Sequence, residues 1–142
     1  MFRRNGYESK HQTPQTAKGA KNMNQFPYFY NNQAEKFAFY RIPKTLFADE
    51  RFAMLSVEAK LLYGLMLDRM GLSRINGLID NLNRVYIYFT LDEVMECFHC
   101  AREKANKLVA ELDARGIGLI ETKRQGMGKP NIIYVKDFSS CG

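Results

Sequence analysis

The sequence has few of the residues on which disulfide frameworks, metal sites and most enzymes depend. Its 142 residues include three cysteines and two histidines, and a small, odd number of cysteines indicates a reducing compartment, which we take to be the cytoplasm. Its longest apolar run, residues 85–91, is interrupted by Thr90 and is far shorter than a membrane span. No apolar stretch of the secretory type follows the N-terminus. The sequence therefore predicts neither a secreted, disulfide-stabilised protein nor a membrane protein.

The motifs of nucleotide-binding and hydrolytic enzymes are also missing. The chain has no G-x-x-x-x-G-K-[ST], G-x-G-x-x-G or G-x-S-x-G motif, no acidic cluster and no base placed beside a nucleophile. Cys97, His99 and Cys100 are spaced as metal ligands can be, but zinc needs four ligands, and Cys141 and His11 lie in the two tails. We therefore expect a protein that is not an enzyme, with no metal and no cofactor, and with Cys97 packed in the core.

What the sequence does contain is ample apolar material and an uneven positive charge. Hydrophobic residues make up 46% of the chain, enough for the core of one ordinary domain. The formal net charge is +6, of which residues 1–25 carry +4. Residues 5–25 have almost no apolar side chains and cannot offset the entropy of ordering. We expect a basic, disordered N-terminal arm with an aromatic edge over residues 1–36, a folded domain over residues 37–138 and a tail over residues 139–142.

The first predicted elements of the folded domain are a helix and a strand. A helical apolar pattern starts after Ser56, which can cap the helix, and continues to about Met70, where Gly71 closes it. Residues 72–83 contain asparagine-rich turns and predict a loop. Residues 84–89 then alternate with a period of two and are rich in β-branched and aromatic side chains, which predicts a strand.

Two further helices follow this strand. Thr90 and Glu93 form a capping box that starts a short helix through Phe98. Residues 100–115 have one clean apolar face and predict a longer amphipathic helix that Gly116 ends. A short helix that turns into a longer amphipathic one is typical of a helix-turn-helix.

The last elements are two strands joined by a basic loop. Residues 117–123 and 131–135 read as strands, and the loop between them contains two glycines and several cations. Together the elements predict an α+β domain: a winged helix-turn-helix with a three-stranded antiparallel sheet and a basic β-hairpin wing.

Four polar residues of the longer helix are candidates for DNA contact. In a helix-turn-helix the N-terminal half of this helix enters the major groove. Arg102 or Lys107 could bind guanine, Asn106 could pair with adenine, and Lys104 lies beside them. Cations at this end of a helix oppose its dipole, and bound phosphate would offset that cost. The alternative is an ordinary solvated face, with Glu103 and Lys107 as an i,i+4 pair.

The loop of the hairpin supplies a second set of candidates. A wing of this kind lies along phosphates or in the minor groove, where cations contribute affinity more than sequence choice. The alternative is a turn that only aids solubility. The candidates are Lys123, Arg124, Gln125 and Lys129.

Three blocks of the sequence, in order, resemble one protein family. The first block is FYRIPKTLF followed by LSVEAKLLYGLMLDRM, the second is RVYIYFT, and the third is KRQGMGKPNIIYV. Over residues 37–138 the chain is similar to the N-terminal domain family of plasmid replication initiator protein A (RepA) of low-GC Gram-positive bacteria. The family commonly has Cys-Ser or a similar pair before the second helix, where this chain has Cys100 and Ala101.

The resemblance implies a winged helix that binds repeated sites (iterons) in double-stranded DNA at a plasmid origin, forms a homodimer and positions the initiation of replication. Members of the family often carry the iterons inside their own gene. They continue into a C-terminal domain thought to engage host replication proteins, which we expect to be absent here. The DNA-facing positions that the resemblance implies are Arg102, Lys104, Lys107, Lys123, Arg124 and Lys129.

Two other functions stay open from the residues alone. A winged helix can be a protein-interaction module, as in the DnaD-like primosome proteins that the family is similar to. Glu103 and Glu111 on the outer helix face favour this alternative, because acidic side chains repel phosphate. A transcriptional regulator would share both the fold and the DNA contacts.

Overall fold

The computed structural model describes residues 25–31 and 36–140 of the chain. The chain divides into two units, Met1–Phe39 and Tyr40–Gly142, and each is described here by itself. The disorder predicted for residues 5–25 lies almost entirely outside the described residues and stays a prediction.

Aromatic side chains dominate the described part of the first unit. The ring of Phe37 meets the rings of Phe29 and Phe39 edge-on, with centroids 5.9 and 6.3 Å apart. The side chains of Phe26 and Tyr28 are exposed. This stretch therefore contains one small aromatic cluster of its own.

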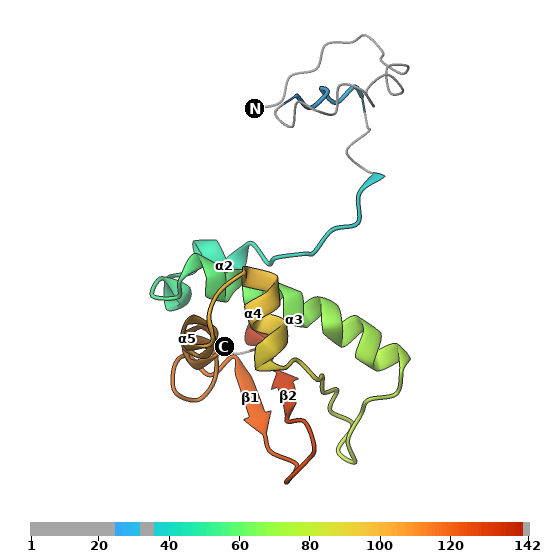
Figure 1. Cartoon of the computed structure of the whole chain (residues 1–142), viewed down its shortest axis with the longest axis vertical. Helices are drawn as coiled ribbons and strands as arrows, with labels where there is room; N and C mark the ends of the chain where they lie inside the picture. The colour runs from blue at the N-terminus through green and yellow to red at the C-terminus, as the bar shows by residue number, and fades with distance from the viewer. Residues whose placement is uncertain (1–24, 32–35, 141–142) are drawn as a thin grey trace. The chain divides into compact units, whose positions relative to one another are not determined.

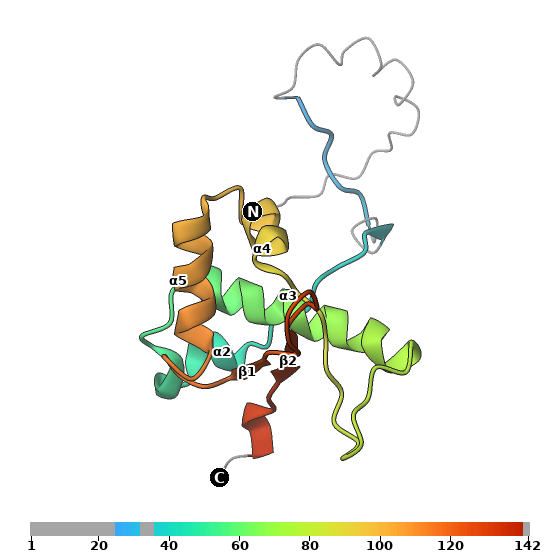
Figure 2. The ribbon, with the colours of Figure 1, turned by 60° about the horizontal axis from the view of Figure 1, so that its bottom comes forward.

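The second unit is an α+β domain, as the sequence predicts. Its helices and both strands contribute apolar side chains to one core, which includes Leu62, Met66, Ile87, Val94 and Ile120. Figures 1 and 2 show how the helices and the two-stranded hairpin are arranged. None of the helices in the described part combines the length and the apolar character that crossing a bilayer requires. In chain order the elements are α2 (Thr45–Ala48), the 3-10 helix η3 (Glu50–Phe52), α3 (Val57–Ile75), α4 (Leu91–Phe98), α5 (Arg102–Leu112), β1 (Ile120–Lys123), β2 (Ile132–Val135) and the 3-10 helix η4 (Phe138–Ser140).

Helix α3 begins where the sequence predicts and ends later. The Ser56 hydroxyl accepts a hydrogen bond from the backbone N–H of Ala59, at 3.1 Å, and so caps the helix. The predicted end near Met70 is wrong, because Gly71 is exposed and its cost in a helix interior is only about 1 kcal/mol. The helix instead ends before Gly77, whose φ of 77° is the left-handed conformation of a helix C-terminus.

The third strand of the predicted sheet is reduced to a single residue pair, so that prediction is corrected to two strands within the described residues. Ile87 exchanges both backbone hydrogen bonds with Ile133 of β2, each at 2.9 Å. On one side of this pair, Val85 bridges to Ile79 in its own loop. On the other side, the carbonyl of Tyr88 accepts a hydrogen bond from the Arg69 guanidinium at 2.6 Å. The backbone groups on both sides of Ile87 therefore have other hydrogen-bond partners, and the pairing with β2 does not extend beyond this residue.

The carboxylate of Asp80 holds the loop before this pair together. It accepts hydrogen bonds from the backbone N–H groups of Leu82 and Arg84, from the Arg84 guanidinium and from the Tyr134 hydroxyl, all at 2.9 Å. The N–H of Arg84 and these other donors hold the pKa of Asp80 well below its usual range, because they stabilise the charged form.

Acid will therefore destabilise the domain in part through Asp80. A carboxyl whose pKa is lowered by folding stabilises the fold above its unfolded-state pKa of about 3.9, and that stabilisation is lost as the pH falls below this value. We expect Asp80→Asn to be less stable than the wild type at neutral pH and to lose less stability between about pH 5 and pH 3. Urea-unfolding midpoints measured across this pH range test this, and parallel curves for the two proteins would contradict it.

Helices α4 and α5 form as predicted, with a shorter α5. The capping box of Thr90 and Glu93 is present at the start of α4. Helix α5 spans Arg102–Leu112 instead of residues 100–115. It starts late because the N–H of Cys100 still bonds back to α4, at the carbonyl of Met95. It ends early because the carboxylate of Asp113 accepts hydrogen bonds from the backbone N–H and the guanidinium of Arg115. These side-chain bonds form a tight turn in place of the next turn of the helix.

The predicted hairpin is confirmed. β1 and β2 pair antiparallel, from Ile120 opposite Val135 to Lys123 opposite Ile132, and residues 124–131 form the loop between them. The hairpin points away from the helices in Figure 1.

Candidate nucleic-acid interface

Helix α5 presents a polar outer face because its inner face is anchored in the core. Ala105, Leu108 and Leu112 are at most 2% exposed, and they recur at the three- and four-residue spacing of one helix face. The residues that this packing leaves exposed in the first two turns are Arg102, Glu103, Lys104, Asn106 and Lys107.

Arg102 is paired with an acidic residue but stays accessible. A terminal nitrogen of its guanidinium lies 3.2 Å from a carboxylate oxygen of Asp92 in α4. Both side chains are exposed, Arg102 by 62% and Asp92 by 81%. An ion pair this exposed contributes at most about 1 kcal/mol, so a phosphate or a base can take its place.

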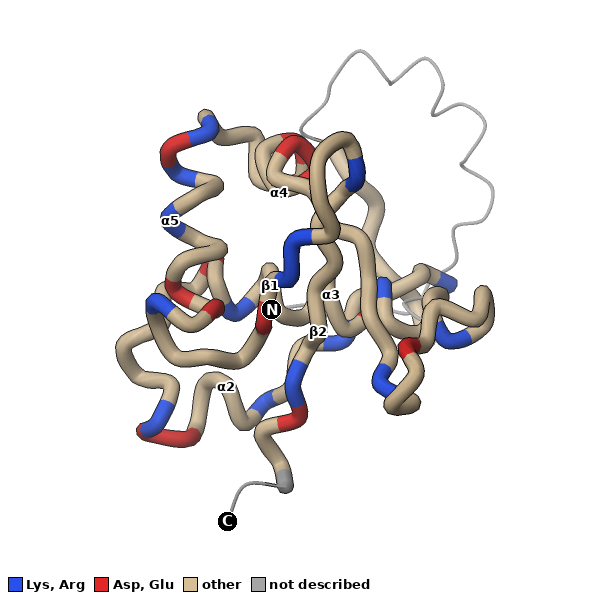
Figure 3. Tube along the Cα trace, turned by 90° about the horizontal axis from the view of Figure 1, so that it is seen from below, with Lys and Arg blue, Asp and Glu red and all other residues tan. Residues whose placement is uncertain are grey.

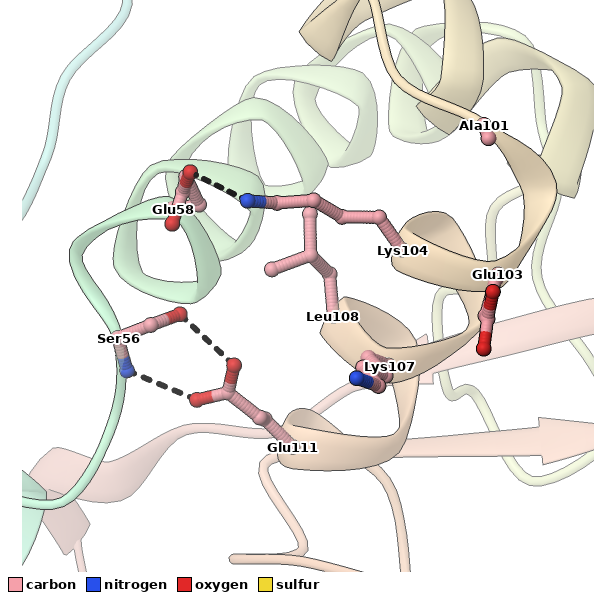
Figure 4. Close-up of a pocket in the computed structure, with 8 residues that line it drawn as sticks. All are labelled: Ser56, Glu58, Ala101, Glu103, Lys104, Lys107, Leu108 and Glu111. Carbon is pink, nitrogen blue, oxygen red and sulfur yellow. Dashed lines mark hydrogen bonds and ion pairs between the residues drawn. The ribbon is translucent and has the colours of Figure 1, made fainter.

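Lys104 lies on the side of α5 that faces α3. Its ammonium group is 3.0 Å from a carboxylate oxygen of Glu58, in the first turn of α3. The pair spans a groove of about 430 Å³ between the two helices, to which Lys107 and Leu108 also contribute (Figure 4). Of the four helix residues predicted to contact DNA, Lys104 is thus the one that forms an ion pair between α5 and α3.

Glu111 also faces α3, and not outward as the sequence suggested. Its two carboxylate oxygens accept hydrogen bonds from the backbone N–H and the hydroxyl of Ser56, at 2.8 and 2.7 Å (Figure 4). A carboxylate at this position also complements the positive end of the α3 dipole. The acidic character of the outer face of α5 is therefore due to Glu103 alone.

Lys107 and Asn106 remain free on the outer face. Both are exposed, and neither has a hydrogen-bond or ion-pair partner in the described part of the chain. Together with Arg102 they are the donors that α5 can offer to a ligand. In Figure 3, blue segments that mark Lys and Arg lie along α5 and on the hairpin.

The hairpin loop is basic, exposed and braced at its base. The side chains of Lys123, Arg124 and Lys129 are exposed and have no partner among residues 25–31 and 36–140. The side-chain amide of Gln125, in contrast, donates to the carbonyl of Pro130 at 2.8 Å across the loop. Gln125 therefore shapes the loop, while the three cations are available to a partner. No acidic residue lies between Glu121 and Asp137.

A comparison with protein families identifies the domain. The family model described as "Replication initiator protein A (RepA) N-terminus" matches residues 38–141. The chain belongs to this family. The resemblance found in the three sequence blocks is thereby confirmed.

Known relatives of this RepA-type domain agree with the assignment. A curated relative from Lactobacillus helveticus, described as "41 kDa protein", is 31% identical over 93 residues, which are 66% of this chain and 26% of the relative. The chain thus matches about a quarter of that protein's length. Among solved structures, "N-Terminal domain of DNA binding protein" is 34% identical with a TM-score of 0.63 and covers 80% of this chain and 85% of its own. "Structure of Rep-DNA complex" is 33% identical with a TM-score of 0.63 and covers 78% and 84%.

A third solved structure, "Structure of MDR initiator", is 29% identical to the RepA-type domain with a TM-score of 0.61. It covers 78% of this chain and 86% of its own. All three structures are thus similar to most of the chain in both sequence and fold.

Three residues of the candidate interface were not predicted from the sequence. Asp92 and Glu58 form ion pairs with cations that are distant in the sequence, and no local sequence pattern predicts such pairs. Met127 at the tip of the hairpin is 95% exposed. A signal for Met127 was present, since a large apolar side chain stands between Gly126 and Gly128 in an otherwise polar loop.

The cysteine-containing turn of the domain is arranged differently from the prediction. Cys97 is exposed, whereas Cys100 is half-buried and packs against the core, so the core position predicted for Cys97 is wrong. The inner face of α4 is formed by Leu91, Val94, Met95 and Phe98, and Cys97 falls outside this face. After Phe98 the left-handed His99, with a φ of 51°, redirects the chain. Among the described residues, no three His, Cys, Asp or Glu side chains come close enough to hold a metal ion.

Proposed function

We propose that this RepA-family domain is a winged helix that binds double-stranded DNA at the repeated sites of a plasmid origin and so positions the initiation of replication. α4 and α5 are its helix-turn-helix pair, with α5 in the major groove. The β1–β2 loop is the wing and lies on the DNA backbone. The domain acts in the cytoplasm as a homodimer, and it is a binding module and not an enzyme.

The observation that carries the proposal is the distribution of accessible hydrogen-bond donors and cations on the domain. Arg102, Asn106 and Lys107 are accessible on the outer face of α5, and the loop of the hairpin adds cations without partners in the described part of the chain and contains no acid. Cations without partners can neutralise the phosphates of a polyanion such as DNA. An Arg or Asn side chain can form paired hydrogen bonds with a base edge. One of the similar solved structures is a Rep-DNA complex, which supports the same function.

A protein-interaction module is the second candidate, and Glu103 is the observation that favours it. Its side chain is exposed on the outer face of α5 and has no partner in the described part of the chain. Glu111 does not add to this acidic surface, because its carboxylate is bound to Ser56. A single carboxylate can also accept a hydrogen bond from cytosine N4, so Glu103 is compatible with DNA.

The proposal is tested by binding of the chain to short labelled duplexes that tile its own coding region, against a random duplex at physiological salt. We expect one duplex to be preferred by about a thousandfold or more. Arg102→Ala should then lose about 1–3 kcal/mol of binding to that duplex, with little change on the random one, because it removes a base contact. Lys129→Ala should weaken binding to both duplexes alike, because it removes a phosphate contact.

Two results would contradict this division of roles. Weak binding to every duplex would favour the protein-interaction module. Equal effects of Arg102→Ala on the preferred and the random duplex would remove Arg102 from base recognition and leave it a phosphate contact.

A further inference from the structure

The tip of the hairpin carries a large apolar side chain that the fold does not use. Met127 is 95% exposed, although the domain has a core into which such side chains pack. The two residues beside it, Gly126 and Gly128, have φ values of 121° and 79° and no side chains. Met127 therefore stands alone at a narrow tip of the described hairpin.

The tip is held in shape before any ligand arrives. The N–H of Lys129 donates to the carbonyl of Gly126 at 3.2 Å, which closes a four-residue turn around Met127 and Gly128. The φ of 79° at Gly128 is the value that the third residue of a type II turn requires. The bond from Gln125 to Pro130 braces the loop just below. Because the backbone is already ordered, little conformational entropy is lost when the tip binds.

The charges around the tip indicate its partner. Arg124 and Lys129 flank Met127 on the two arms of the loop, and neither side chain has a partner within the described residues. The minor groove of DNA is bordered by two rows of phosphates and is about 6 Å wide, so it admits a slim tip with a cation on each side. Methionine is also one of the apolar side chains that proteins insert between base steps from the minor groove.

We propose that Met127 enters the minor groove as an apolar wedge and partly unstacks one base step of the bound site. This inference rests on the proposed DNA-binding function and gives the wing a part in choosing the sequence. A wedge favours steps that unstack easily, such as TA and CA, so the wing reads DNA deformability while α5 reads base edges.

The test uses the full chain and the duplex that it prefers, with 2-aminopurine placed in turn at each adenine. We expect the wild type to raise the fluorescence of the probe at one step. Met127→Ala should abolish that signal and weaken binding about tenfold, whereas Met127→Leu should retain the signal, because leucine can also act as a wedge. The slope of affinity against salt should not change in Met127→Ala, since no phosphate contact is lost.

The chain offers a matched control for lost apolar surface. Met54 is 94% exposed and lies between η3 and α3, far along the chain from the hairpin. Met54→Ala should bind and perturb the duplex as the wild type does. Because both methionines are exposed, neither change should lower the unfolding temperature.

Two outcomes would overturn the proposal. Met127→Ala with the affinity and the probe signal of the wild type would show that Met127 serves something other than DNA, such as a contact with another protein. A wild-type chain that prefers no duplex would overturn the DNA-binding function and the wedge together, so the two failures are distinguishable.

Discussion

The affinity of the domain for duplex DNA will fall about 150-fold when the salt concentration rises from about 50 to about 200 mM. The reason is that each neutralised phosphate contributes a slope of about 0.9 to the fall of log K with log salt. Arg102 is assigned to a base and is not counted, so four accessible cations per domain give a slope of about −3.6. The four are Lys107, Lys123, Arg124 and Lys129.

Single alanine variants divide this slope among the cations. Lys107→Ala and Lys129→Ala should each reduce its magnitude by about 0.9. Lys104→Ala is the matched control on the same helix, because its side chain lies on the side of α5 that faces α3, with its ammonium group 3.0 Å from Glu58. Fluorescence-anisotropy titrations at four or more salt concentrations measure the slopes. A slope near zero for the wild type, or equal losses in Lys104→Ala and Lys107→Ala, would refute the proposed set of phosphate contacts.

Gly116→Ala will destabilise the domain by about 2–3 kcal/mol, because there is no room for a side chain in the turn after α5. A Cβ at this position would overlap the backbone carbonyl of Glu111 and lie 2.6 Å from the carbonyl oxygen of Ala110. Both are backbone atoms at the end of α5, so the clash cannot be relieved by a rotamer change. The unfolding temperature should fall by about 10–20 °C, measured by circular dichroism.

Gly71→Ala is the opposite change and serves as the control. Gly71 lies inside α3 and is exposed, and a Cβ there would have no atom within 4 Å. Alanine should therefore stabilise the helix by about 1 kcal/mol. If both glycine variants shift the unfolding temperature in the same direction, the close approach at Gly116 is not what decides its identity.

The parts of the fold that were predictable are those decided by neighbours in the chain. The Ser56 cap acts on a residue three positions away, and the capping box of Thr90 and Glu93 has the same span. The glycines of the hairpin loop likewise act within a single turn. Such interactions depend on local geometry alone, so a pattern of residue types is enough to find them.

The errors occurred where a side-chain contact competes with the regular structure that the pattern predicts. Residues 84–89 have the alternation of a strand, but they do not form one. At one end the Arg69 guanidinium donates a hydrogen bond to the carbonyl of Tyr88, and at the other end the backbone bonds to the loop around Asp80. The pattern of α5 continues past Leu112, but Asp113 binds Arg115 and ends the helix. In both cases side chains satisfy backbone or charged groups that regular structure would otherwise have used.

Residue patterns alone were enough to predict an α+β domain with a short helix, an amphipathic helix and a basic hairpin, and three sequence blocks identified the RepA family. Which charges of the domain are free, in contrast, depends on how its helices pack. Lys104 pairs with Glu58 and Glu111 with Ser56, although each pair is separated by more than forty positions in the chain. A charged group binds whichever opposite charge or hydrogen-bond donor lies near it, and that neighbour is set by packing and not by sequence distance.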